Sequence, residues 1–177
     1  MSLIMVGLFQ GYLEAANVYT CKLATDEPEG TPKNKAQLFF IDRVAELTNN
    51  EVKITLYPGN QLGSSRELIE STQMGSIQAV AVPTSTVAGF EPKISIFDLP
   101  FLFENREHAY KSLDSIGMDL GADMEKNGIK LLGYMENGIR HLTNNIREVK
   151  TPADMKGLKI RVMTNKIYIS MMKALGA

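Results

Sequence analysis

The sequence predicts an α/β fold with a mostly parallel sheet. From residue 17 to residue 82, segments with the two-residue period of strands alternate with segments that carry helix caps and a helical period. Ile77 to Val82 is an almost uninterrupted apolar run with β-branched residues, which is typical of a strand buried on both faces. A length of 177 residues with 44% hydrophobic residues is enough for one core.

The first strand is expected from Asn17 to Ala24. Thr31 and Pro32 are a favourable N-cap and N1 pair, so we expect a helix that begins there and runs to Asn49. Its apolar residues at helical spacing are predicted to form a buried stripe: Ala36, Phe39, Phe40, Val44 and Leu47.

Two more strands and a second helix follow. Val52 to Tyr57 alternates between apolar and polar residues, as a half-buried strand does. Ser64 and Glu67 have the spacing of a capping box at the start of a helix, and Gly75 is expected to end it before the strand from Ile77. This order of elements implies parallel pairing with right-handed crossovers.

The next part of the chain is predicted to be mainly helical. After an irregular stretch, a helix is expected from Asn105 to Asn127, with a break near Gly117. Gly128 is a suitable residue to end it. Ile129 to Met135 is then predicted to be another strand.

The last elements place an arginine in a position suited to a ligand. Thr151 and Pro152 begin a helical turn, and a helix is expected from Lys166 to Leu175. Between them Leu158 to Val162 alternates as a strand, which turns Arg161 away from the core. Arg161 therefore lies at the carboxyl end of a strand just before a helix, where ligands bind in open α/β sheets.

Composition and motifs argue against several classes of protein. Nineteen basic and twenty acidic residues give a net charge of −1 without a basic block, so a nucleic-acid binder is not expected. The single Cys21 excludes an intrachain disulfide and a Cys-rich zinc site. His108 and His141 have no partner at metal-ligand or triad spacing, so no metal and no cofactor are predicted. No P-loop, dinucleotide-binding turn or nucleophile–base motif favours an enzyme.

The beginning of the chain is interpreted as a segment outside the fold. Residues 1–16 contain an apolar stretch and end in small residues, so we expect a leader remnant or an artificial segment there. No apolar run reaches the 18 residues that a transmembrane helix requires, so direct membrane insertion is not predicted.

Four motifs carry a resemblance to a known family. Thr151-Pro-Ala-Asp-Met-Lys-Gly-Leu-Lys-Ile-Arg161 resembles the segment with the carboxylate-binding arginine in the extracytoplasmic solute receptors of TRAP transporters, the DctP family. Three further stretches are similar to that family in the same order: Tyr57-Pro-Gly-Asn-Gln-Leu-Gly63, Asp98-Leu-Pro-Phe-Leu-Phe103 and Glu136-Asn-Gly-Ile-Arg140.

The resemblance implies an α/β fold like that of type II periplasmic binding proteins. Those receptors have two lobes, and this chain resembles the first lobe and the beginning of the second. We expect the first α/β lobe at residues 17–136 and the start of the second, incomplete on the C-terminal side, at residues 137–177.

The resemblance also suggests the site residues. It implies that Arg161 and Arg140 bind the carboxylate of an acid, since a guanidinium offers two parallel N–H bonds. Each arginine has the alternative of an ordinary surface charge. The further candidates are Asn165, Thr84, Asn137 and Glu27. For the two asparagines the alternative is a hydrogen bond to their own backbone in a turn or at a helix start, and for Glu27 it is a favourable charge near a helix N-terminus.

A receptor without catalytic activity is therefore predicted. The resemblance implies a periplasmic protein that is exported through a signal peptide, binds a small organic acid such as a sugar acid or a dicarboxylate, and delivers it to TRAP membrane subunits. Two alternatives are the ligand-sensing domain of a regulator, which the absence of a helix-turn-helix disfavours, and a small α/β enzyme that acts on organic acids.

Overall fold

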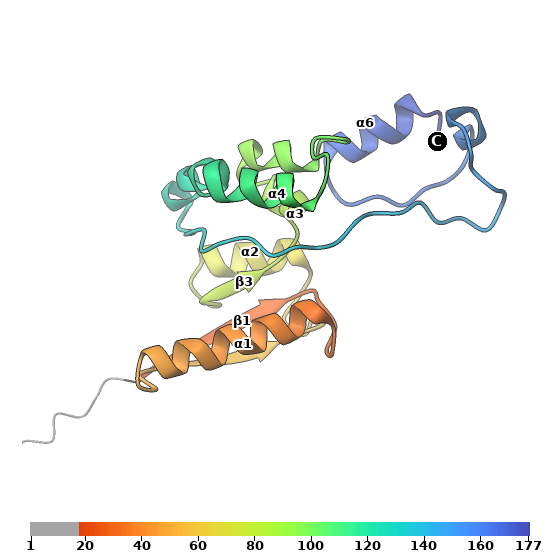
Figure 1. Cartoon of the computed structure of the whole chain (residues 1–177). Helices are drawn as coiled ribbons and strands as arrows, with labels where there is room; N and C mark the ends of the chain where they lie inside the picture. The colour runs from red at the N-terminus through yellow and green to blue at the C-terminus, as the bar shows by residue number, and fades with distance from the viewer. Residues whose placement is uncertain (1–17) are drawn as a thin grey trace, which may run out of the picture.

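The computed structural model describes residues 18–177, and the predicted leader lies outside the described residues. A parallel sheet of three strands has the order β2-β1-β3 (Figure 1). β1 (Tyr19–Thr25) pairs with β2 (Val52–Tyr57) over most of its length, and its end pairs with β3 (Ala79–Ala81). The predicted parallel α/β fold is confirmed.

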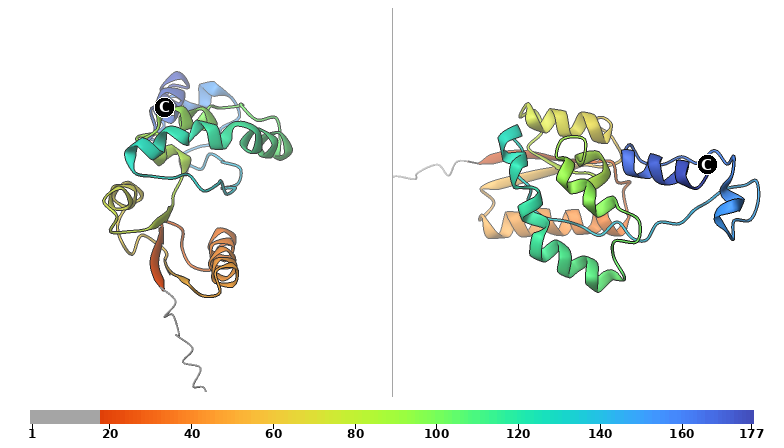
Figure 2. Two further views of the ribbon diagram at one scale, coloured as in Figure 1. Left: turned by 90° about the vertical axis from the view of Figure 1, so that its left-hand side faces the viewer. Right: turned by 90° about the horizontal axis from the view of Figure 1, so that it is seen from above.

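Two helices cover the two faces of this sheet. α1 (Pro32–Leu47) and α2 (Ser65–Gln73) lie on opposite sides of the strands (Figure 2). Both begin where the sequence predicts. The Thr31 side chain accepts a hydrogen bond from the backbone N–H of Asn34, and Ser64 and Glu67 form the expected capping box.

The prediction of which face of α1 is buried is wrong. Phe39 is 72% exposed and Leu47 is 65% exposed, and Ala36 and Phe40 also face outward. The residues that α1 buries are Asn34 and Gln37. Their amides bind polar groups that precede the helix: Asn34 accepts from the N–H of Gly30 in the β1–α1 loop, and Gln37 donates to the Thr25 hydroxyl at the end of β1. These polar contacts decide which face of α1 lies on the sheet.

β3 differs from the prediction in length and burial. It spans three residues, all partly exposed, because it pairs only with β1 and so forms an edge of the sheet. Ile77, just before it, is buried in a cluster with Ala24 and Leu68. A second core cluster joins α2 to the helical segments that follow: Ile69, Ile94, Met124 and Ile129.

Short helices follow β3, and the predicted break in the long helix is confirmed. The segment from Leu113 to Gly117 is a π-helical turn. Tyr134 donates a hydrogen bond to the Gly117 carbonyl at 2.7 Å, and a Cβ on Gly117 would lie 2.8 Å from the Tyr134 ring. The elements are α3 (Thr84–Val87), η1 (Pro92–Asp98), α4 (Arg106–Ser112), η2 (Leu113–Gly117), α5 (Met118–Leu120) and η3 (Ala122–Asn127).

The remainder of the chain, which we call the connecting region (residues 130–177), contains no strand. Two predictions, a strand from Ile129 to Met135 and a strand from Leu158 to Val162, are therefore wrong. Neither segment has a neighbouring strand to pair with among residues 18–177. The region instead runs extended across the molecule to η4 (Pro152–Met155) and α6 (Lys166–Ala174), both as predicted (Figure 1). The predicted lobe boundary after residue 136 falls in this extended stretch and stays a prediction.

Residues 18–177 include no helix with the length and apolar character needed to span a bilayer.

Candidate functional site

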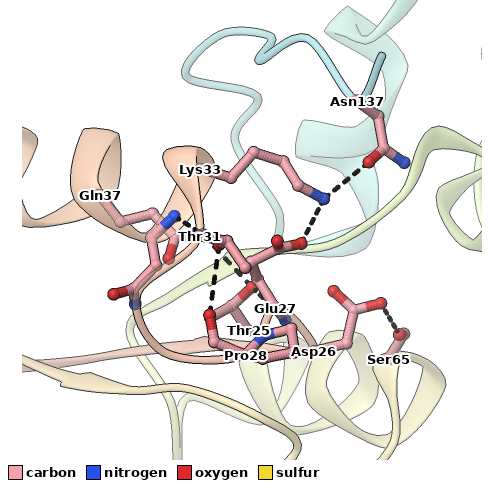
Figure 3. Close-up of polar contacts among 10 residues, drawn as sticks. Thr25, Asp26, Glu27, Pro28, Thr31, Lys33, Gln37, Ser65 and Asn137 are labelled. Carbon is pink, nitrogen blue, oxygen red and sulfur yellow. Dashed lines mark hydrogen bonds and ion pairs between the residues drawn. The ribbon is translucent and has the colours of Figure 1, made fainter. Parts of the chain in front are cut away.

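The β1–α1 loop and the connecting region meet through a lysine that the sequence analysis did not single out. Lys33, in the first turn of α1, forms an ion pair with Glu27 and donates a hydrogen bond to Asn137 Oδ1 at 2.7 Å (Figure 3). Two predicted site residues, distant in sequence, are thus joined by one ammonium group. Asp26 lies next to them and accepts a hydrogen bond from Ser65 Oγ at 2.9 Å.

The ionisation of Glu27 follows from this arrangement. Burial of its carboxyl group raises its pKa, but hydrogen bonding and the positive charge of Lys33 act in the other direction and outweigh the burial. The pKa is therefore lowered overall, and Glu27 is an anion paired with Lys33 at neutral pH.

A second network collects two more predicted residues around Asp98. The Asp98 carboxylate accepts hydrogen bonds from Thr84 Oγ1 at 3.2 Å, from Asn165 Nδ2 at 2.7 Å and from Tyr168 Oη at 3.0 Å. Burial of the Tyr168 hydroxyl and the adjacent Asp98 charge raise its pKa, and the Arg140 charge opposes this shift.

Both predicted arginines are exposed, and Arg140 borders this second network. The Arg140 guanidinium lies over the Tyr168 ring, 5.7 Å from its centroid. Arg161 makes no side-chain hydrogen bond or ion pair with any group in residues 18–177. Guanidinium groups that the protein does not neutralise are suited to bidentate pairing with a carboxylate.

The six predicted residues thus fall into two groups and one separate residue. Lys33 links Glu27 to Asn137, and the Asp98 network links Thr84 and Asn165 to the side of Arg140. Arg140 follows Asn137 by three positions, so the same stretch of chain adjoins both groups. The structure does not bring Arg161 into contact with either group.

Sequence reasoning missed three residues of these networks: Lys33, Asp98 and Tyr168. Asp98 begins a motif that was noted only for its resemblance, and a carboxylate within an apolar stretch was the available indication of its role. Lys33 and Tyr168 stand in ordinary helical sequence, and nothing local marks them.

Residues 23–177 match the profile of the family described as bacterial extracellular solute-binding protein, family 7, or DctP. The 2,3-diketo-L-gulonate-binding periplasmic protein YiaO of Escherichia coli is 41% identical over 139 residues, which are 78% of this chain and 42% of that protein. The C4-dicarboxylate-binding protein DctB of Bacillus subtilis is 37% identical over 150 residues, which are 84% and 43% of the two chains.

A solved structure agrees with these relatives. A TRAP periplasmic solute-binding protein from Polaromonas sp. JS666, bound to D-erythronate, superimposes with a TM-score of 0.85 at 36% identity, and the match covers 89% of this chain and 52% of that one. The chain spans about half the length of the relatives it matches.

The parallel sheet and the family match together define the class, that of bacterial extracellular solute-binding proteins. The chain belongs to the DctP family, the solute receptors of TRAP transporters.

Proposed function

We propose that this chain forms part of a periplasmic receptor that binds a small organic acid, either a sugar acid or a dicarboxylate. Arg140 and Arg161 pair with the ligand carboxylate, and Asn137, Glu27, Thr84 and Asn165 face its remaining oxygens. The observation that carries the proposal is the exposed Arg140 beside a buried polar network, with the exposed Arg161 four residues before Asn165 of that network, in a chain of this family.

Charge supports an acid as the ligand. Among residues 18–177, Lys33 is paired with the Glu27 carboxylate, whereas neither Arg140 nor Arg161 forms an ion pair with a carboxylate. An anionic ligand supplies the negative charge that balances the two guanidinium groups. The relatives named for 2,3-diketo-L-gulonate and for C4-dicarboxylates, and the neighbour bound to D-erythronate, support the same chemical class.

Export and delivery belong to the same proposal. The receptor reaches the periplasm through a signal peptide, closes around its ligand and passes it to TRAP membrane subunits. It performs no chemistry on the acid, because its role is to carry the ligand unchanged.

A thermal-shift screen of a full-length receptor tests this function. Uronic, aldonic and C4-dicarboxylic acids are compared with neutral sugars of the same size, and the hits are measured by calorimetry. An acid at 100 times its Kd should stabilise the receptor by about 2.7 kcal/mol, whereas the matched neutral sugar should not. The acid should be recovered unchanged. A receptor stabilised equally by neutral sugars, or one that converts the acid, contradicts the proposal.

A further inference from the structure

Asp98 carries a buried negative charge that neutral side chains stabilise. Its residue exposure is 7%, and three hydrogen bonds from Thr84, Asn165 and Tyr168 satisfy its carboxylate. No lysine or arginine in residues 18–177 forms an ion pair with it. A buried charge is costly unless hydrogen bonds compensate it, so each of the three donors stabilises this carboxylate.

The donors come from parts of the chain that are far apart. Thr84 begins α3, close to the end of β3, whereas Asn165 and Tyr168 belong to the N-terminal turn of α6. Asn165 uses both ends of its amide: Nδ2 donates to Asp98, and Oδ1 accepts from the backbone N–H of Ile167 at 2.9 Å. Asp98 therefore holds the residue that caps α6 and fixes where this helix begins.

The start of α6 contacts Arg140, and Arg161 lies a few residues before it in the sequence. The Tyr168 ring that donates its hydroxyl to Asp98 also lies beneath the Arg140 guanidinium. Arg161 precedes Asn165 by four positions, so a fixed Asn165 restricts the place where Arg161 can lie. Movement of the Asp98 carboxylate would shift both cations relative to the sheet.

We propose that Asp98 is a positioning residue of the acid-binding site, because its carboxylate holds the N-terminal turn of α6, and with it Arg140 and Arg161, in the arrangement that meets the ligand. This inference rests on the proposed function. Asp98 itself does not contact the ligand, since a second carboxylate beside an acid would repel it.

The Asp98→Asn substitution in a full-length receptor tests this role. The carboxamide keeps the size of the side chain but places an NH₂ group opposite one of the three donors, so the network loses a hydrogen bond. We expect the affinity for the acid to fall by about tenfold, as for residues that act on a site without touching its ligand. Asp123→Asn, the same change in a partly exposed carboxylate that pairs with Lys93 and Lys126, is the matched control and should leave the affinity unchanged.

A spectroscopic readout follows the network itself. The pKa of the Tyr168 hydroxyl, measured by NMR of ring-labelled tyrosine, should move toward its ordinary value in Asp98→Asn because the adjacent negative charge is removed. It should not change in the Asp123→Asn control. An unaltered acid affinity in a folded Asp98→Asn receptor would overturn the proposal, whatever the Tyr168 titration shows.

A second variant keeps the test decisive if Asp98→Asn does not fold. Tyr168→Phe removes one hydroxyl and keeps the ring under Arg140. We expect it to weaken acid binding several-fold in the presence of Asp98 and to have little further effect beside Asp98→Asn. Unchanged binding in Tyr168→Phe, or fully additive effects in the double variant, would contradict the positioning role. Failure of the unaltered receptor to bind any acid would instead contradict the proposed function.

Discussion

The sheet region (residues 18–129) and the connecting region use similar sequence patterns with different results. Val52 to Tyr57 and Leu158 to Val162 both alternate apolar and polar residues. The first segment pairs along its whole length with β1, whereas the second forms no strand. Alternation therefore specifies the two faces of a potential strand, but a strand forms only where another can satisfy its backbone groups.

Burial separates the two regions in the same way. Eight of the ten buried apolar residues among residues 18–177 belong to the sheet region, and the other two are Met155 and Leu158. The sheet region thus holds the stability of the described fold, whereas the connecting region supplies exposed arginines and polar contacts to the site.

Truncation of buried leucines should give the largest difference in stability between the two regions. Leu68 is fully buried in a core cluster, so Leu68→Ala should lower the free energy of unfolding by about 2–5 kcal/mol. Leu158→Ala should cost less than half as much, because Leu158 lies outside both core clusters. Urea unfolding measures both values, with the exposed Met74→Ala as a control. Equal losses for the two leucines would contradict the assignment of the core.

The two capping boxes allow the same comparison with a smaller expected change in stability. Ser64 and Glu67 cap α2 in the sheet region, and Thr151 and Asp154 form the same motif at η4. Ser64→Ala should lower the free energy of unfolding by about 1 kcal/mol. Thr151→Ala should change it by a few tenths at most, because no residue of η4 belongs to either core cluster and its opening should leave the core folded. The same urea experiment measures both variants. A larger loss of unfolding free energy in Thr151→Ala than in Ser64→Ala would contradict the view that the sheet region holds the stability of the fold.

Features that depend on adjacent residues could be predicted from the sequence better than features that depend on distant partners. The caps at Thr31 and Ser64 and the helix end at Gly128 depend on a few adjacent residues, and the structure confirms them. The apolar stripe of α1 and the two unpaired strands depend on partners elsewhere in the chain. Asn34 bonds to the β1–α1 loop and Gln37 to the end of β1, so α1 turns a different face to the sheet from the one that apolar spacing predicts.

The candidate site shows the same limit. Thr84, just after the third predicted strand, and Asn165, near Arg161 in the sequence, are both predicted site residues, and both lie in one network. Asp98 connects them, and only the folded chain shows that three donors from distant segments converge on its carboxylate. Their direct contact with a ligand remains a prediction.

The Lys33 bridge between the regions predicts a weak dependence on pH. Glu27 has a lowered pKa in the folded state, so its pairing contributes fully above the ordinary glutamate pKa of about 4.3 and is lost as pH falls through the folded value. The difference in unfolding free energy between the unaltered protein and Glu27→Gln should be below about 1 kcal/mol at pH 7 and should vanish in acid. A difference that grows as pH falls would contradict the pairing.

Substitution of the histidines should have the smallest effect. His108 lies in α4 and His141 in the connecting region, and we expect neither to take part in binding. A receptor with both changed to alanine should bind the same acid with similar affinity in calorimetry. Loss of binding in this variant, with its fold retained, would contradict a metal-free and non-catalytic site.

The central claim, that the connecting region supplies the cation that binds the acid, is tested most directly by the affinity of Arg161→Lys in a full-length receptor. Lysine keeps the charge but cannot form the two parallel hydrogen bonds, so calorimetry should show a loss of about 1.5–3 kcal/mol, on the order of ten- to a hundredfold in Kd. Arg43→Lys, the same change at an exposed arginine of α1, should leave Kd unaltered. An Arg161→Lys receptor that binds the acid as tightly as the Arg43→Lys control would contradict the claim.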